Sequence, residues 1–458
     1  MIKTDLDQRK TALILVGLGA FLIPFMGSSL SIALPLIGDD LTGNVILLGW
    51  LPMVFTLANA AFLLPFGKLA DIHGRKKIFA YGVVIYTVAS LLAALSPSIT
   101  FLILSNFFQG LGCSMIFATG VALLSSVYPP QHRGEALGFF VTAIFIGLFL
   151  GPLLGGFLAQ SLGWRSIFFF NVPLGIFLFS LIIWKLRGEW YGSKDAKFDH
   201  LGSAIYIPSL VALFYGFTAM GDTLGQVIFT AGVLGFVTFI FHETRTEYPI
   251  LNIKLLTRRV SALPAVGLLF INVATTALWP LLSLYLQDIL NFGPLWAALI
   301  ISAQPLMVSL LSPVTGRLSD RMDGRILMVL GAVAITIGLL ALSYLDIETE
   351  LWWIVMGLVL VGVGMAFFAP VTTNFFMGSI SRENYGMASA TQSTMIYAGQ
   401  TFSLGLLILI FTGFMGGVQI TSANFSVFLL SLKIAFTLLA VFSGIGLVLS
   451  LFMKRPAP

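Results

Sequence analysis

A short group of glycine, acidic and basic residues occurs twice in the chain, and its composition suits a loop that forms ion pairs. The glycines permit a tight turn, and an aspartate can pair with an arginine a few residues further on. We expect each group to act as a gate that holds neighbouring parts of the protein together in one conformation; the alternative is a basic loop without a conformational role. The residues of the two copies are Gly67, Asp71, Gly74 and Arg75, and Gly316, Asp320 and Arg325.

A second pattern is a glycine-rich stretch with one proline. Gly147, Gly151 and Gly155 are spaced four residues apart, so they lie on one face of a helix, where another helix backbone can approach closely. Pro152 leaves one carbonyl without its helical partner and permits a bend, and Gly156 ends the stretch. The alternative interpretation is ordinary packing of small residues.

Polar residues within otherwise apolar segments could contact a substrate. The candidates for this cavity are Ser28, Asn59, Asn106, Gln109, Gln304, Asn374 and Tyr397. Each could instead form a hydrogen bond between helices, worth about 0.6 kcal/mol in a membrane. None of the 19 acidic residues falls near the centre of an apolar segment, so we expect an uncharged cavity for neutral or amphipathic molecules. Asp222 and Asp288 come nearest, and we expect both to be solvated loop residues.

The sequence does not indicate enzymatic or metal chemistry. Cys113 is the single cysteine, which permits neither an internal disulfide nor a cysteine-based zinc site, and the four histidines are scattered. No nucleophile constellation or phosphate-binding loop is present. We therefore expect no catalytic residues, no metal, no cofactor and no nucleic-acid partner.

Membrane-spanning helices must position these residues. The chain has 458 residues, of which 58% are hydrophobic and 9% charged, with a mean hydropathy of +1.00, which excludes a water-soluble protein. A transmembrane helix needs about 20 mainly apolar residues, and about fourteen such runs occur. The first is long and is followed by many more, so we expect an anchor and not a cleaved signal peptide. The predicted spans are 11–37, 45–66, 78–95, 98–127, 137–162, 166–186, 201–220, 226–242, 260–287, 295–315, 326–345, 351–376, 386–416 and 428–453.

The basic residues predict the orientation of these spans. If the N-terminus is cytoplasmic, only Arg165 and Lys433 of the 24 Lys and Arg residues fall outside the cytoplasmic loops. An odd error in the number of helices would scramble this distribution. We therefore expect a multi-pass protein with both termini in the cytoplasm.

The repeated group belongs to a longer internal repeat. Gly110 and Gly112 match Gly362 and Gly364 at nearly the same offset, about 250 residues. Both copies fall on the same side of the membrane, as in parallel repeats. The predicted organisation is an N-terminal six-helix bundle over residues 1–187, a connector with two additional helices over 188–258, and a C-terminal six-helix bundle over 259–458.

These motifs resemble those of one transporter family. Gly67 to Lys77 resembles motif A of the major facilitator superfamily, Gly147 to Gly156 resembles its antiporter motif, and Gly163 to Gly175 resembles the segment that opens helix 6 in fourteen-helix drug exporters. The resemblance covers nearly the whole chain and indicates the fourteen-helix drug:proton antiporter branch. It implies an all-α polytopic major-facilitator fold whose two halves rock around a midplane cavity, and drug efflux across the cell membrane by antiport with protons.

Two positions depart from the pattern of that branch. Met26 stands where an aspartate is usual in helix 1, and Asn106 stands where an arginine is usual in helix 4. The acid and the base that the resemblance implies for proton coupling are thus both absent.

The sequence leaves three functions open. The leading hypothesis is an alternating-access exporter of neutral or lipophilic small molecules, with a small-molecule substrate, the lipid bilayer and protons as partners, acting as a monomer in the cell membrane. An uncoupled facilitator, or a transporter of lipid-like substrates, would need no intramembrane acid. A non-transporting receptor or scaffold is disfavoured because the glycine and aspartate group is kept in both halves.

Overall fold

The computed structural model is predominantly helical in the part of the chain that it describes. It describes residues 2–129, 133–192, 197–247, 249–251, 253, 259–379, 385–416 and 418–453. Fourteen of its helical segments are long and apolar enough to cross a membrane, which confirms the predicted number of spans and the all-α membrane fold.

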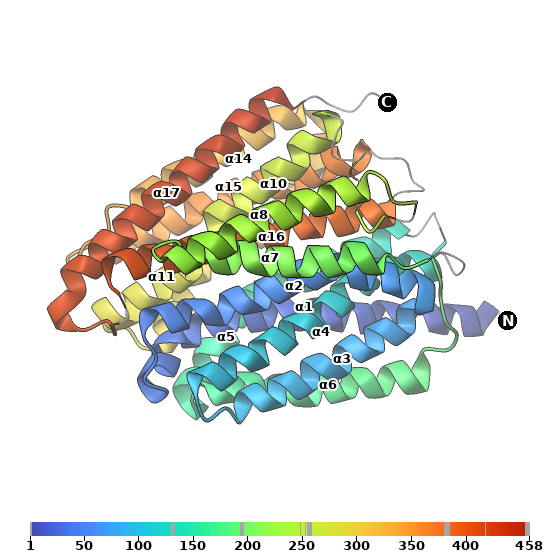
Figure 1. Ribbon diagram of the computed structural model, residues 1–458, viewed down its shortest axis with the longest axis horizontal. Coiled ribbons are helices and arrows are strands. Elements are labelled where there is room, and N and C mark those ends of the chain that lie inside the picture. The colour runs from blue at the N-terminus through green and yellow to red at the C-terminus, as the bar shows by residue number, and fades with distance from the viewer. Residues whose placement is uncertain are drawn as a thin grey trace.

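The chain runs through two sets of six spans with a helical hairpin between them (Figure 1). The first set comprises α1 (Ile2–Asp40), α2 (Val45–His73), α3 (Arg75–Ala94), α4 (Ile99–Val127), α5 (Arg133–Leu162) and α6 (Arg165–Lys185). The hairpin comprises α7 (His200–Thr218) and α8 (Thr223–Glu243). The second set comprises α10 (Arg259–Thr276), α11 (Leu278–Leu284), the π-helix η1 (Tyr285–Ile289), α12 (Pro294–Ile301), α13 (Ala303–Arg321), α14 (Gly324–Leu342), α15 (Leu351–Gly378), α16 (Tyr385–Phe414), the short 3-10 helix η3 (Ser422–Asn424) and α17 (Phe425–Phe452).

Two spans of the second set are made of more than one helix. The ninth span, Val260–Ile289, consists of α10, α11 and η1, and the tenth, Pro294–Gly316, contains α12 and most of α13. The apolar run is continuous across both breaks, so hydropathy predicts each as one span.

Local residue types explain where several helices begin. Asn44 and Asp199 cap α2 and α7, since their side-chain oxygens accept hydrogen bonds from the backbone N–H groups of Leu47 at 2.9 Å and Gly202 at 2.8 Å. Between α2 and α3 the backbone of Gly74 has a φ of 112°, a conformation that favours glycine.

The repeat read from the sequence is also a repeat of packing. A Cβ on Gly110 would stand 2.4 Å from the carbonyl oxygen of Phe55, and one on Gly362 would stand 2.5 Å from that of Gln304. Gly112 and Gly364 correspond in the same way. A Cβ on Gly112 would meet Gly82 and Tyr86, and one on Gly364 would meet Gly331 and Ile335. Matched glycines therefore bring matched pairs of helices into backbone contact in the two halves.

The two halves meet at an interface that we call the seam, and the hairpin packs against it. We call the end of the bundle where α1 begins and α17 ends the terminal end, and the opposite end the far end (Figure 1). Near the far end, Gly49 of α2 faces Ile408 of α16, and Gln287 of η1 donates a hydrogen bond to the carbonyl of Ile32 in α1 at 2.9 Å. On another side of this seam, Gly156 of α5 packs on Pro294 and Ala298 of α12.

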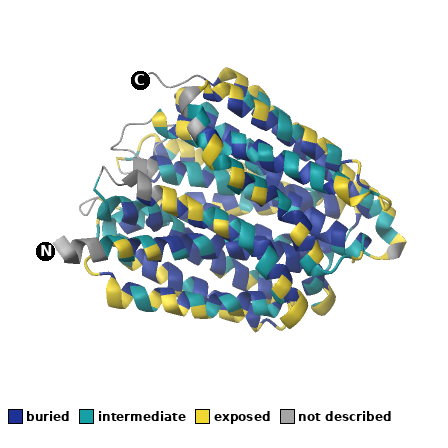
Figure 2. Cartoon of the chain, turned by 180° about the vertical axis from the view of Figure 1, so that it is seen from behind, coloured by how far each residue is buried: buried dark blue, intermediate teal, exposed yellow. Residues whose placement is uncertain are grey.

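The hairpin touches both halves. The hydroxyl of Tyr206 in α7 donates to the carbonyl of Ala60 in α2 at 3.0 Å. Phe217, at the other end of α7, stacks on Phe402 of α16 with ring centroids 4.7 Å apart. α8 lies outside α7 and is mostly exposed, as Figure 2 shows for the outward surfaces of the bundle generally. Since the exposed side chains there are largely apolar, the outward face suits lipid.

Candidate functional site

The first copy of the predicted gating group forms a closed ion pair at the terminal end. Arg75 donates from Nε and Nη2 to Oδ1 of Asp71, at 2.9 and 2.7 Å. Its Nη1 reaches α4, where it donates to the carbonyl of Ala122 at 3.0 Å and to the Ser126 hydroxyl at 2.5 Å. Arg75 thereby ties the end of α2 and the start of α3 to α4, all within the first half.

The connector after α6 packs over this group, which the sequence did not predict. The carboxylate of Glu189 accepts from the backbone N–H of Lys76 at 2.7 Å, near the N-terminus of α3, where a negative charge is favourable. The N–H of Gly192 donates to the carbonyl of Asp71 at 3.0 Å. A Cβ on Gly192 would stand 2.3 Å from Asp71 Oδ1, so a larger residue would displace the Asp71 carboxylate from its present position.

The second copy is arranged differently. The side chain of Asp320 lies outside the described residues. Arg325 is exposed, and its backbone N–H donates to Asp323, which caps α14, at 3.0 Å. A Cβ on Gly316 would meet open space. The pairing of Asp71 with Arg75 therefore has no described counterpart in the second half.

The glycine-rich stretch of α5 packs along α1. Cβ atoms added at Gly147 and Gly151 would stand 2.5 Å from the Phe21 carbonyl oxygen and 1.8 Å from the Ser28 hydroxyl. A Cβ on Gly155 would likewise meet Ser29, whose hydroxyl donates to the carbonyl of Gly151 at 2.7 Å.

Two further residues of the glycine-rich stretch, Pro152 and Gly156, have different surroundings. Pro152 lies buried inside α5 without ending the helix. Gly156 faces α12 of the other half instead of α1. The stretch thus joins a contact within one half to a contact across the seam.

Three buried amide side chains in the first half donate hydrogen bonds through their NH2 groups, but among the described residues nothing donates to their carbonyl oxygens. Asn59, Asn106 and Gln109 are 0% exposed, and their amide groups donate to Cys113 Sγ at 2.8 Å, to the Leu102 carbonyl at 2.9 Å and to the Ser90 hydroxyl at 2.8 Å. Within the described part of the chain, the carbonyl oxygens of all three amides have no hydrogen-bond partner. A buried acceptor without a donor is costly, so this region can receive hydrogen-bond donors.

One of these amides lies at the seam. The hydroxyl of Tyr397 in α16 is beside the Asn59 amide and the Cys113 thiol. The Tyr397 ring makes an edge contact with Phe117 of α4, with centroids 6.1 Å apart. Asn59, Cys113, Phe117 and Tyr397 therefore form an uncharged group contributed by both halves, which we call the seam group.

The remaining cavity candidates lie elsewhere. Gln304 is buried in the second half, where it accepts from Trp279 Nε1 at 3.1 Å and donates to Met365 Sδ at 2.9 Å. Ser28 donates to the Pro24 carbonyl of its own helix at 2.8 Å, under Gly151. Asn374 is exposed, one residue from Phe375, which packs on Gly324. The structure thus brings Asn59 and Tyr397 together, whereas Asn374 is exposed on α15.

Met26, which replaces the usual acid, is buried inside the first half. Its sulfur accepts from Asn171 Nδ2 of α6 at 3.4 Å, and Asn171 also accepts from the Tyr86 hydroxyl at 3.1 Å. Neither Asn171 nor Tyr86 was predicted as a site residue, although Asn171 is a polar residue within a predicted span.

The two spare acids differ in their surroundings. Asp222 is exposed in front of α8, as expected. Asp288 is half-buried within η1, in the last turn of the ninth span, so the expectation of a solvated loop residue is wrong for Asp288. The reason is that the π-helix extends the span to Ile289, past its predicted end at residue 287.

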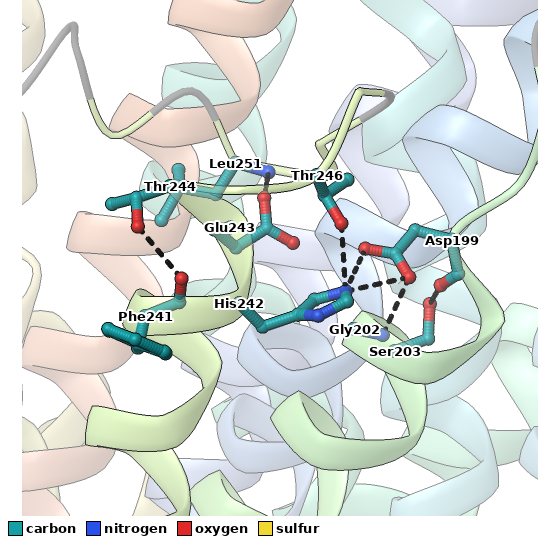
Figure 3. Close-up of polar contacts among 9 residues, drawn as sticks. All are labelled: Asp199, Gly202, Ser203, Phe241, His242, Glu243, Thr244, Thr246 and Leu251. Atoms are coloured by element: carbon teal, nitrogen blue, oxygen red, sulfur yellow. Dashed lines mark hydrogen bonds and ion pairs between the residues drawn. The ribbon is translucent and has the colours of Figure 1, made fainter.

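A polar cluster closes the terminal end of the hairpin (Figure 3). The Asp199 carboxylate contacts His242 Nε2 at 2.9 Å, and Thr246 lies 3.1 Å from the same nitrogen. Glu243 is 4% exposed and accepts from the backbone N–H of Leu251 at 3.0 Å. The cluster joins the start of α7, the end of α8 and the segment that leads to the second half, which makes it a structural clamp.

Comparisons with known proteins agree with this architecture. A sequence model described as Major Facilitator Superfamily matches residues 16–251 and 264–458. The chain is similar to the riboflavin transporter RibZ of Clostridioides difficile, with 26% identity over 98% of both chains, and to the multidrug resistance protein Stp of Mycobacterium tuberculosis, with 29% identity over 86% of this chain and 74% of Stp. Its fold is similar to that of the human organic anion transporter MFSD10, with a TM-score of 0.65, 14% identity and coverage of 96% of this chain and 99% of that one.

Proposed function

Because the chain belongs to the Major Facilitator Superfamily, we propose that it exports neutral or lipophilic small molecules by alternating access. The chain is a multi-pass membrane transporter of small molecules and not an enzyme. The moving parts are residues 1–187 and 259–458, bridged by residues 188–258. The substrate binds between them near the membrane midplane, as parallel repeats allow.

The seam group is the observation that carries this proposal. It combines an amide, a thiol, an aromatic ring and a phenol from both halves, and none of these groups is ionised at neutral pH. The unpartnered carbonyl oxygen of Asn59 can accept a hydrogen bond from a substrate. Riboflavin, named in one relative, is an aromatic ring system with hydroxyl and N–H donors, and therefore suits such a site.

The contacts at the two ends of the bundle support rocking of the halves. The seam is packed toward the far end, where Gly156 meets α12 and Gln287 meets α1. At the terminal end Asp71 contacts Arg75 and Gly192 on its own side of the hairpin. This arrangement fits a state closed at the far end, in which Asp71 pairs within its own half and would exchange that pairing to engage the other half once the terminal end closes.

We include coupling to protons and a monomer in the cell membrane in this proposal. The concentration of basic residues in the loops of the terminal end favours a cytoplasmic location of both termini. A facilitator without coupling is the second candidate. It is favoured by one specific observation, that the buried residues Met26 and Asn106 are both uncharged.

Transport by purified protein in liposomes separates these functions. Uptake of riboflavin and of the neutral dye Nile red is measured with and without an imposed pH gradient. Accumulation that requires the gradient supports the proton-coupled exporter. Equilibration that ignores the gradient supports the facilitator. The absence of flux of either compound would refute transport of neutral molecules and leave a receptor or scaffold.

The seam group is tested by removing its polar atoms. Asn59→Leu and Tyr397→Phe should each reduce transport several-fold, because a lost hydrogen bond costs about 1 kcal/mol. Tyr81→Phe is the matched control, since Tyr81 is 58% exposed on α3. Equal activity of all three variants and the unmodified chain would place the substrate elsewhere.

A further inference from the structure

A shallow, open aromatic depression, which we call the hollow, lies at the far end of the second half. Its volume is about 270 Å³, and it is lined by Tyr344, Thr349, Glu350, Trp352 and Trp353, at the turn between α14 and α15. Nothing in the transport proposal uses these side chains.

Hydrogen bonds hold the walls of the hollow in place. Trp353 donates from Nε1 to the carbonyl of Ala341 at 2.8 Å, which ties the start of α15 to the end of α14. The two indole rings stand almost perpendicular, at 82° with centroids 5.5 Å apart. The indole N–H of Trp352 donates to the carboxylate of Glu350. A carboxylate is therefore held at the N–H edge of the Trp352 indole, next to two rings that stand nearly perpendicular to each other.

The loop behind the hollow is also anchored. The hydroxyl of Tyr285 in η1 donates to the carbonyl of Asp346 at 2.6 Å, and the N–H of Asp346 donates to the Thr349 hydroxyl at 2.7 Å. These contacts give the turn a defined shape even though Tyr344 and Trp352 are 70% and 58% exposed.

The charged side chains around the hollow favour a ligand that carries a cationic group next to an anionic one. Asp346, Glu348 and Glu350 are exposed acids within one turn. Ring faces attract ammonium groups, and the ammonium of Lys433 already stands 5.8 Å from the centroid of the Tyr344 ring. Lys433 in turn offers a positive charge at the edge of the hollow, so an acidic aromatic corner and one basic group lie side by side.

The position corresponds to the headgroup layer of a bilayer. The span of α14 ends at this turn, and the span of α15 begins after it. α14 packs on α17 through the Thr336 and Ser443 hydroxyls, 2.9 Å apart. Lys433 follows the start of α17 by roughly 12 Å along the helix, within the reach of a side chain that extends to the interface.

Aromatic residues at span ends commonly serve only as interface anchors. An anchor needs neither a carboxylate held at the indole N–H nor a lysine beside a neighbouring ring. We propose that the hollow binds the headgroup of a zwitterionic phospholipid, with its ammonium group against Trp352, Trp353 and Glu350 and its phosphate beside Lys433.

Native mass spectrometry of the full chain tests this directly. The detergent-solubilised protein is offered phosphatidylethanolamine, phosphatidylcholine and phosphatidylglycerol with identical acyl chains. We expect the two zwitterionic lipids to be retained in preference to phosphatidylglycerol. Glu350→Gln and Trp352→Leu should each lower that retention about fivefold, the size of one cation–π or charged contact, and Lys433→Met should lower it as well.

Trp296→Leu is the matched control, because Trp296 is 62% exposed on α12, at the same end of the bundle, and lies outside the hollow. Equal retention of all three lipids by the unmodified chain would overturn the proposal. So would equal effects of Trp296→Leu and Trp352→Leu, which indicate a general interfacial role of aromatics. An unchanged melting temperature of Glu350→Gln shows that its effect is not unfolding.

Discussion

The far-end seam can be tested by adding one methyl group at Gly156. A Cβ there would stand 2.6 Å from Ala298 Cβ and 2.8 Å from the Pro294 carbonyl oxygen. Neither atom belongs to the end of a flexible side chain, so the clash cannot be relieved by a rotamer change. Because α5 and α12 belong to different halves, Gly156→Ala should destabilise the state closed at the far end and spare the state open there.

The structure sets the size of the effect. Overpacking by one methyl group costs about 1 to 3 kcal/mol. Since each 1.4 kcal/mol is a factor of ten, the population open at the far end should rise about 5-fold to 150-fold relative to the closed state.

Labelling of a cysteine in the seam measures this shift. Ser283 of α11 is 0% exposed, and its hydroxyl lies 3.4 Å from the carbonyl of Ile32. A Ser283→Cys thiol should react with a membrane-impermeant maleimide only when the far end opens. Adding Gly156→Ala to this variant should accelerate that reaction about 5-fold to 150-fold. Native Cys113 is 0% exposed, and its slow background is measured in the chain without the introduced cysteine.

Gly147→Ala is the matched control. A Cβ at Gly147 would stand 2.5 Å from the Phe21 carbonyl oxygen, a clash of similar severity inside the first half. It should lower the melting temperature without changing the labelling rate of Ser283→Cys. If Gly156→Ala and Gly147→Ala changed the labelling rate equally, or if neither did, the seam would not be the moving interface.

Three further substitutions test the charged and buried positions. Asp71→Asn weakens the pairing at the terminal end and should slow transport in liposomes without preventing membrane insertion; unchanged flux would argue against a gate. Met26→Asp places a carboxyl beside Asn171, where Met26 is 1% exposed, and should change the pH dependence or cation selectivity of transport; an inert variant would speak against the uncharged cavity. Glu189→Gln removes the charge near the N-terminus of α3 that Lys76 N–H contacts, and should cost about 0.3 to 1 kcal/mol in thermal stability; no change in melting temperature would contradict that role.

Much of the fold follows from local properties of the chain. A span needs a run of apolar residues, whatever its neighbours are, so the number of spans can be counted from hydropathy. The break between α10 and α11 could not be predicted, since the residues on both sides are apolar and the break depends on packing. Asp288 was expected in a loop because the predicted span ends before it, whereas η1 extends the span to Ile289.

The candidate site was less predictable, because a polar residue within a span can face any of several neighbours. Asn59 and Asn374 are alike in type and both lie within spans, yet Asn59 reaches Tyr397 across the seam and Asn374 is exposed. Which helix face is turned inward depends on the partners of that helix, and those partners are distant in the sequence.

By itself, the sequence determined the membrane class, the fourteen spans and the duplicated halves, because hydropathy and repeated motifs are local properties of the chain. Only the tertiary structure decided that the connector packs on Asp71, that Gly156 faces the other half while Gly147 faces its own, and that Asn59 meets Tyr397. These are contacts between segments far apart in the chain, and they depend on how each helix is rotated and on which helices lie next to it.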